Sequence, residues 1–148
     1  MAAIVGRKDS AVAYVGTTET LKLADKVSNV TNFEFPKPEK TNIDVTDFDS
    51  DGAEEEYGTT DFGEVSIEQH LVSKEKNAKF QKLCDDETDV YFNLFLKNKE
   101  GEVIVGRKGK GKVKSIEYTN IQINNAFVVK ITLKVNGKVT DVEAEPAE

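Results

Sequence analysis

Apolar and polar residues alternate along much of this chain, and a period of two residues is typical of β-strands that bury one face. The clearest run spans residues 126–135. Its apolar face holds Phe127, Val129, Ile131, Leu133 and Val135, and its polar face holds Lys130, Thr132 and Lys134. Residues 64–72 and 88–97 alternate in the same way, and a weaker apolar run extends from residue 21 to residue 35. These patterns predict a mainly β protein.

A helix is predicted over residues 73–84. Ser73 is a favourable N-cap, because its side chain can accept a hydrogen bond from the first helical turn. Phe80, Leu83 and Cys84 recur at helical spacing and form an apolar stripe, which is expected to pack on the sheet. Cys84, the only cysteine of the chain, is therefore expected to be a small core residue rather than a reactive thiol.

Short hairpin strands are predicted after the helix, with turns over residues 98–101 and 106–112. The glycine spacing of a phosphate-binding loop occurs in the second turn, Gly106-Arg107-Lys108-Gly109-Lys110-Gly111-Lys112. Val113 stands where such a loop needs a magnesium-binding hydroxyl, and no helix is predicted to follow. We therefore interpret the segment as a flexible basic turn that can touch an acidic surface of another subunit. Its candidate contact residues are Arg107, Lys108, Lys110 and Lys112.

The length of 148 residues fits a single domain over residues 1–148. Three segments are expected to lie outside its core: an N-terminal arm over residues 1–19, a long loop over residues 36–60 and a C-terminal tail over residues 138–148. The loop is longer than most connections and lacks sustained periodicity, so no regular structure is expected in it. Between residues 39 and 61 it is strongly acidic, with Lys40 as its only basic residue.

The loop contains half of a calcium-binding pattern. Asp47, Asp49 and Asp51 alternate before Gly52, as in the first half of a calcium loop, where carboxylates surround a hard cation. The twelfth position of such a loop falls on Gly58 instead of a bidentate glutamate, and the flanking segments are predicted strands rather than helices. We therefore interpret the segment as a solvated acidic loop. A monomeric β-sandwich that binds calcium through the three aspartates remains an alternative.

The amino-acid composition argues against several classes of function. The 20 Lys and Arg against 27 Asp and Glu give a formal net charge of −7, which does not favour tight nucleic-acid binding by the whole surface. With one cysteine and one histidine, neither a disulfide nor a Cys/His zinc site can form within the chain. His70 falls on the polar face of a predicted strand, and no nucleophile stands in a recognisable catalytic pattern. No enzyme activity and no cofactor are therefore expected.

The sequence shows no pattern that predicts a signal peptide or a membrane-spanning segment. No basic leader followed by a long apolar stretch occurs near residue 1, so no signal peptide is expected. No segment approaches the roughly 20 apolar residues that cross a bilayer. We therefore expect no membrane partner.

The predicted order of strands, acidic loop, strand, helix and hairpin strands resembles that of the major tail tube proteins of long, flexible-tailed bacteriophages of the lambda type. The segments that carry the resemblance are Asn42–Glu55 and Asp61–Ile67, in which an acidic turn and small residues lead into Gly-Glu-Val. The position of the helix and of the strand over residues 90–96 agrees as well, so the resemblance covers about residues 20–136. The chain ends soon after its last predicted core strand, so the additional C-terminal domain of some relatives is not expected.

This resemblance implies a fold of two packed β-sheets, a sandwich or partial barrel, flanked by one α-helix. It also implies a structural virion protein that assembles in the host cytoplasm and forms hexameric rings, which stack into the tail tube. DNA is expected to pass through the lumen without sequence-specific binding. The expected partners are other copies of the chain and the tape-measure, tail terminator and distal tail proteins. A tail terminator and the ring protein of a secretion tube, which share the fold, are further alternatives.

In that family the long loop reaches the adjacent ring. The residues that the resemblance assigns to this contact are Pro36, Pro38, Asp44, Asp47, Asp49, Asp51, Glu54, Glu55 and Glu56. Because basic residues concentrate in residues 97–114, we expect the acidic loop and the basic patch to meet between subunits or rings and to steer assembly. We also expect the loop to be mobile in the free subunit and to become ordered on stacking.

Overall fold

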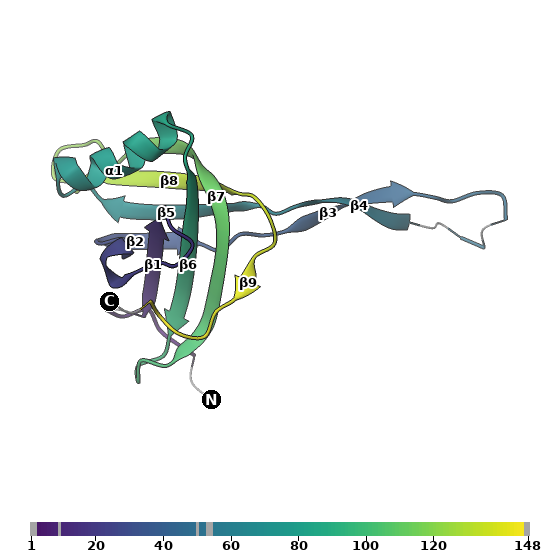
Figure 1. Ribbon diagram of the computed structural model, residues 1–148, viewed down its shortest axis with the longest axis horizontal. Helices are drawn as coiled ribbons and strands as arrows, with labels where there is room; N and C mark the ends of the chain where they lie inside the picture. The colour runs from purple at the N-terminus through teal and green to yellow at the C-terminus, as the bar shows by residue number, and fades with distance from the viewer. Residues whose placement is uncertain (1–2, 9, 50, 53–54, 147–148) are drawn as a thin grey trace.

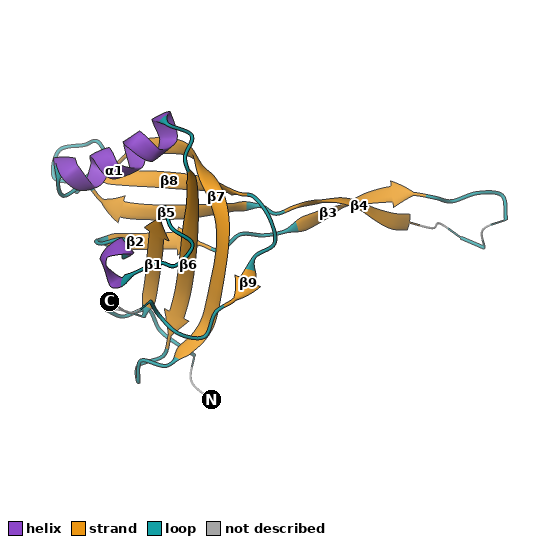
Figure 2. Ribbon diagram, in the orientation of Figure 1, coloured by secondary structure: helices purple, strands orange, loops and turns teal. Residues whose placement is uncertain are grey.

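The computed structural model describes residues 3–8, 10–49, 51–52 and 55–146, and strands dominate its fold (Figures 1 and 2). Along the chain, the described elements are β1 (Ala11–Gly16), the short 3-10 helix η1 (Leu23–Asp25), β2 (Val30–Glu34), β3 (Glu39–Asp44), β4 (Glu55–Asp61), β5 (Glu64–His70), α1 (Lys74–Asp85), β6 (Asp89–Lys97), β7 (Val103–Thr119), β8 (Val128–Val135) and β9 (Thr140–Asp141). None of the described helices has the length and apolar character needed to cross a membrane.

One antiparallel sheet forms the body of the molecule. Its strands lie in the order β1-β6-β7-β8-β5-β2, with β9 paired to β7, and β3 and β4 form a separate two-stranded sheet. The body has two layers because β7 belongs to both: Val103–Lys112 pairs with β6, and Gly111–Thr119 pairs with β8. The register shifts between Val113 and Ser115, and such an irregularity bends and twists a strand. In Figure 1, β1, β6 and the first part of β7 cross the strands β8, β5 and β2.

The mainly β fold with one flanking helix is therefore confirmed, and its two packed layers are the two halves of one folded sheet. The main core lies between these layers. Its almost completely buried residues include Val65, Ile67, Val90, Phe92, Leu94, Val129, Ile131 and Leu133. The apolar faces predicted for β5, β6 and β8 are confirmed at these positions. Phe127, predicted on the apolar face of residues 126–135, and Leu71, which continues the alternation of residues 64–72, lie just beyond the strand ends and are exposed.

The helix α1 packs beside β7 at one edge of the layers (Figure 2). Phe80 and Leu83 enter the main core, and Cys84 packs partly against it, as the helical stripe predicts. The Nζ of Lys79 also donates a hydrogen bond to the carbonyl oxygen of Val15 at 3.2 Å. The helix therefore joins β7 and β1 through both apolar and polar contacts.

The prediction of an N-terminal arm over residues 1–19 is wrong for its central part. Residues Ala11–Gly16 form β1, which pairs with β6 and is buried on both faces. Ala13 and Val15 face the main core. The opposite face contributes to a smaller buried cluster of Val12, Tyr14, Leu21 and Phe95. A continuous apolar run is consistent with a strand buried on both faces, and the search for alternation cannot detect such a strand.

The flexible turn predicted over residues 106–112 is also wrong, because β7 runs through it without interruption. Its glycines allow other segments to approach closely. A Cβ atom at Gly106 would lie 2.0 Å from the carbonyl oxygen of Val142, and one at Gly111 would lie 2.3 Å from that of Lys134. Both contacts are far shorter than any real Cβ contact. The glycine spacing therefore reflects the close packing of this strand against its neighbours.

Replacing Gly111 by alanine is expected to destabilise the fold by about 1–3 kcal/mol, the usual cost of extra carbon in a tightly packed site. The added methyl group has no room beside the β8 backbone, so the two strands must move apart locally. Urea unfolding measures the difference. Gly6→Ala is the matched control, since a Cβ atom at Gly6 meets nothing within 4 Å. Equal unfolding midpoints for the two variants would contradict the packing role of Gly111.

Candidate functional site

The most prominent feature outside the body is the hairpin of β3 and β4, residues 39–61, which we name the arm. Its strands pair from Glu39↔Asp61 to Asp44↔Glu55 and, among the described strands, only with each other. Figure 1 shows the arm projecting away from the body, beyond the start of β5. The prediction of a loop without regular structure is therefore wrong.

The solvent exposure of the arm explains why its strands are not recognised from the sequence. Alternation arises when one face of a strand is buried and the other is wet, and a strand exposed on both faces has no reason to show it. Glu39, Lys40, Asn42 and Ile43 are all exposed, on both faces of β3. The arm therefore carries charged, polar and β-branched residues in no fixed order.

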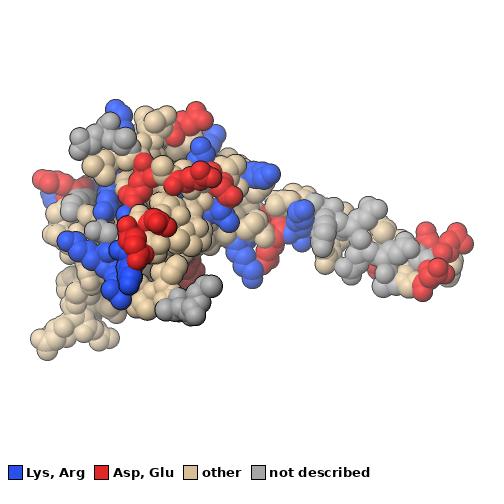
Figure 3. All heavy atoms as spheres, turned by 90° about the horizontal axis from the view of Figure 1, so that it is seen from below, with Lys and Arg blue, Asp and Glu red and all other residues tan. Residues whose placement is uncertain are grey.

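Acidic residues crowd the tip of the arm, and Figure 3 shows them at its far end. The exposed ones among the described residues are Asp44, Asp47, Asp49 and Asp51. The Asp47 carboxylate accepts a hydrogen bond from the backbone N–H of Asp49 at 3.0 Å, which closes a tight turn. Hydrogen bonds from the side chain and the backbone of Thr46 lower the pKa of Asp44. Among the described residues, no three metal-ligating side chains group closely enough to hold a metal ion. Calcium binding by Asp47, Asp49 and Asp51 stays an alternative prediction.

The base of the arm is fixed to the body. The Asp61 carboxylate accepts hydrogen bonds from the Lys134 Nζ at 2.8 Å and from the backbone N–H of Gly63 at 3.0 Å. The Lys134 hydrogen bond is the main cause of the lowered pKa of Asp61, and the same contact raises the pKa of Lys134. Gly63 has a φ of +85°, and a Cβ atom there would lie 2.7 Å from the carbonyl oxygen of Lys37. These contacts set the direction in which the arm leaves the body.

The remaining residues predicted for inter-ring contact lie on both sides of the tip. Pro36 and Pro38 stand between β2 and β3, where their lack of an N–H group ends one strand ladder before the next begins. Glu54 lies outside the described residues. Only the backbone is described for Glu55 and Glu56, which belong to β4.

The outer surface of β5 and β8 is polar, as the alternation predicts. We name it the polar face, and its opposed residues are Glu64 with Lys134, Ser66 with Thr132, and Glu68 with Lys130. Lys114 of β7 lies 2.5 Å from the Glu64 carboxylate, and Asn32 of β2 donates a hydrogen bond to Glu68 at 3.0 Å. Opposite charges therefore stand side by side on this face, which does not carry a single sign of charge.

The basic patch predicted from the sequence lies along β7, where Asp89 of β6 compensates part of it. Lys110 and Lys112 lie 3.9 and 4.0 Å from the Asp89 carboxylate. Lys108 lies on the same strand and has no carboxylate partner among the described residues. The net positive charge of the patch is therefore smaller than the sequence indicates.

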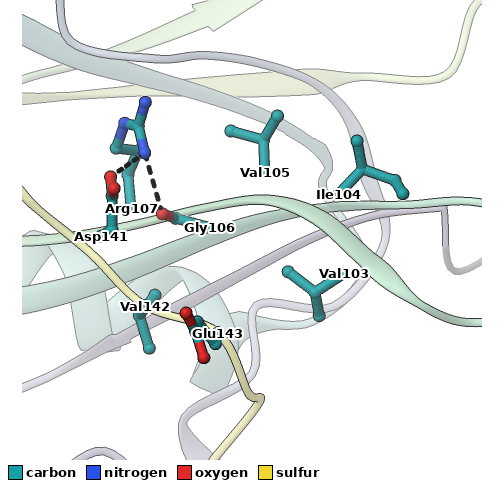
Figure 4. A pocket seen from close by; sticks show the side chains of 8 residues that line it. All are labelled: Val103, Ile104, Val105, Gly106, Arg107, Asp141, Val142 and Glu143. Atoms are coloured by element: carbon teal, nitrogen blue, oxygen red, sulfur yellow. Dashed lines mark hydrogen bonds and ion pairs between the residues drawn. The ribbon is translucent and has the colours of Figure 1, made fainter.

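The fourth residue of the patch, Arg107, belongs to the docking site of the C-terminal segment (Figure 4). It is ion-paired with Asp141 of β9 and also donates a hydrogen bond to the carbonyl oxygen of Gly106 at 3.3 Å. The C-terminal tail predicted over residues 138–148 is held against the body as far as Glu145. That carboxylate accepts a hydrogen bond from the Tyr14 hydroxyl at 2.5 Å and is ion-paired with Lys97.

Two effects oppose each other at Glu145. Burial raises the pKa of this carboxyl. The hydrogen bonds from Lys97 and Tyr14, together with the positive charges of Lys97 and Lys26, outweigh this effect, so the pKa lies below its ordinary value of 4.5. Because Lys97 belongs to β6 and Tyr14 to β1, the ionised carboxylate fixes the C-terminal segment to two strands of the body.

An apolar surface that sequence analysis missed lies at the other end of β5 from the arm. We name it the end patch, and it consists of Leu71, Val72, Ile121, Ile123 and Phe127. The antiparallel register places its two segments together, because His70 opposes Val128 and the N–H of Leu71 donates to the carbonyl oxygen of Phe127 at 2.9 Å. His70 itself is exposed, as expected for a surface histidine.

Ile121 and Ile123 alternate with polar residues, a pattern that is typical of a β-strand. Asn120 and Asn124 adopt φ values of 60° and 71°, a left-handed conformation that asparagine tolerates better than most residues. These two positions interrupt the extended chain between β7 and β8. The isoleucines therefore lie in a loop and not in the sheet.

No protein-family model matches the sequence, and no curated protein sequence is significantly similar to it. Solved structures do share the fold. A chain in the tail of an empty gene transfer agent particle with C6 symmetry gives a TM-score of 0.68 at 12% identity, covering 93% of this chain and 99% of that chain. A chain in the sheath/tube terminator of the PVC extracellular contractile injection system gives 0.69 at 12% identity, covering 96% and 99%. A chain of the SPP1 tail tube gives 0.63 at 14% identity, covering 97% and 81%.

Acidification is expected to release the C-terminal segment. Because the pKa of Glu145 is lowered in the folded protein, its stabilising effect is present above 4.5 and is lost as the pH falls through the lowered value. Glu145→Gln should therefore reduce the thermal midpoint by about 2–4 °C at neutral pH. It should change the midpoint much less at a pH well below 4.5.

Differential scanning fluorimetry at the two pH values measures this difference. Glu143→Gln is the control, since Glu143 is an exposed glutamate of the same segment. An effect of Glu145→Gln that is equally large under both conditions would rule out the ionic anchor.

Proposed function

We propose that this chain is the subunit of a tail tube, in which copies close into hexameric rings and the rings stack into a hollow tube that conducts DNA. The arm is the observation that carries this proposal. It is a long hairpin that pairs with no other described strand and exposes apolar residues at its tip. An unpaired, partly apolar extension of this kind is a liability in a monomer and a contact element in an assembly.

The fold supports the same conclusion. The chains that share it come from a gene transfer agent tail, a sheath/tube terminator and a tail tube, and the similarity extends over nearly the whole of this chain. The C6 symmetry named for the gene transfer agent tail supports rings of six subunits. The protein would then reside in the tail of a virion, after assembly in the host cytoplasm.

The polar face is the surface we assign to the channel. It lacks apolar side chains that would need cover, and its Lys130 and Lys134 stand opposite Glu68 and Glu64. A surface with paired charges suits a water-filled channel for a polyanion, because its carboxylates offset the lysines that would otherwise hold phosphates. DNA would therefore pass without sequence-specific binding.

Two finer assignments also belong to this proposal. The segments Asn42–Glu55 and Asp61–Ile67 support a tail of the long, flexible lambda type, although a chain from a contractile injection system has the same fold. The partners would be tape-measure, tail terminator and distal tail proteins. A terminator or a secretion-tube ring is the competing assignment, and long tubes formed by the purified chain in negative-stain images would favour the tube subunit.

Deleting residues 44–56 is expected to leave a folded monomer that forms no long tubes. The described side chains of this segment are exposed, so the thermal midpoint should stay within about 2 °C of the wild-type value, as for surface changes. Fluorimetry and negative-stain microscopy at equal protein concentration check the two outcomes. A Gly/Ser segment of equal length in place of residues 44–56 should fail as well, because the arm acts through its side chains. Normal tubes from the deletion variant would refute the role of the arm.

Raising the salt concentration is expected to slow tube growth by roughly tenfold, because steering between the acidic arm and the basic patch is screened. Lys108→Gln should slow growth at low salt in the same direction, since Lys108 has no described carboxylate partner. Light scattering measures the growth rate. Lys82→Gln removes the same charge from an exposed position on α1 and should have no such effect. A growth rate that does not change with ionic strength would rule out electrostatic steering.

A further inference from the structure

The end patch is an ordered apolar surface that the body leaves uncovered. Ile123 is 91% exposed, Ile121 67% and Val72 59%. The loop that carries the isoleucines is held by backbone hydrogen bonds, from the N–H of Gln122 to Asn120 at 2.9 Å and from the N–H of Asn125 to Gln122 at 3.2 Å. The pairing of His70 with Val128 brings both segments to one end of the sheet, and exposed apolar side chains gathered at one place are typical of contact surfaces between proteins.

The tip of the arm carries apolar residues that match this surface. Ile43 is 49% exposed, Val45 37%, and Phe48 is exposed completely. A phenylalanine without any cover is the kind of anchor that fills a partner's apolar surface. Among the described side chains of the tip, these three would supply the apolar part of a contact.

The two surfaces lie at opposite ends of the same strand. The arm ends at Asp61, just before β5 begins at Glu64, whereas the end patch follows His70, where β5 ends. The strand between them spans about 20 Å, and the arm projects in the direction away from the end patch (Figure 1). The tip of one copy is therefore remote from its own end patch, and a contact between them requires two copies.

The charges of the two surfaces are compatible. Residues 119–127 contain no charged side chain. Most of their polar side chains are amides, which can donate hydrogen bonds to carboxylates. These amides belong to Asn120, Gln122, Asn124 and Asn125. The polar face, by contrast, presents Glu64, Glu68, Lys130 and Lys134 and so offers an apolar anchor no apolar surface. An acidic tip with an apolar anchor therefore fits the end patch better than it fits the polar face.

We propose that the end patch of one copy receives the tip of the arm of a copy in the neighbouring ring, with Phe48 packed against Ile121 and Ile123. This inference rests on the proposed tail-tube function and names the surface on which the arm acts. The two surfaces differ and lie at opposite ends, so their contact is heterologous and repeats from copy to copy without closing. Each added ring would therefore present the same free surface as the one before it.

Cysteine pairing tests the contact. In a Cys84→Ala background, Phe48→Cys protein mixed with Ile123→Cys protein is expected to form mixed disulfide dimers on mild oxidation. Docking raises the effective concentration of the two thiols, so the yield should exceed that of a control pair by roughly tenfold or more. The control pair is Phe48→Cys with Glu100→Cys, an exposed position in the turn between β6 and β7. A chain with both Phe48→Cys and Ile123→Cys should give a ladder of covalent multimers.

Substitutions in the end patch test the consequence for assembly. The double variant Ile121→Ser, Ile123→Ser should form no tubes at concentrations at which the wild type does. Its thermal midpoint should stay within about 2 °C, because both side chains are exposed in the single copy. Ile123→Glu should block assembly more strongly than Ile123→Lys, since the incoming tip is acidic.

The outcomes separate this inference from the proposed function. Cross-linking no better than the control pair, or normal tubes from the double serine variant, would overturn the end patch as the receiving surface. If deletion of residues 44–56 still abolished tubes in that case, the tail-tube function would stand and the arm would dock elsewhere. Failure of the wild-type protein to form rings or tubes under any condition, without cross-links, would overturn both.

Discussion

The double pairing of β7 is the constraint on which the rest of this molecule depends. The strand is 17 residues long, and it pairs first with β6 and then with β8, so that one sheet becomes two layers with a core between them. Its glycines make this possible. A Cβ atom at Gly109 would lie 2.7 Å from the Phe92 ring, and one at Gly111 would meet the β8 backbone. The segment that most resembles a phosphate-binding loop in the sequence is therefore the central structural strand.

The placement of the contact surfaces follows from this arrangement. Because β8 is held by β7, and β5 by β8, the direction of β5 is fixed relative to the core. The arm leaves from the start of β5, where Asp61, Gly63 and Lys134 set its path, and the end patch follows the end of the same strand. The distance between the base of the arm and the end patch is therefore set by one short, well-packed strand.

The elements that were predicted correctly are those with one buried and one wet face. β5, β8 and α1 lie between core and solvent, so their sequences alternate or recur at helical spacing. β6 also alternates, although Phe95 on its second face is buried in the smaller cluster. β1 and the arm depart from this condition in opposite directions, since β1 is buried on both faces and the arm is exposed on both. Two parts of the candidate site could be predicted from the sequence. The acidic tip is visible in the composition of residues 39–61, and the polar face is visible in the alternation of polar and apolar residues. The end patch and the docking of Glu145 do not, because the turns at Asn120 and Asn124 and the contacts with Tyr14 and Lys97 exist only in the folded chain.

The pairing of charges across β5 and β8 has a consequence for anything that moves along that surface. Glu64 and Glu68 stand opposite Lys134 and Lys130, on strands about 4.8 Å apart. The electric field of such alternating rows decays over a distance similar to their spacing, faster than the field of an equal number of like charges. A long polyanion that passed such a surface would therefore be attracted less strongly than by the lysines alone.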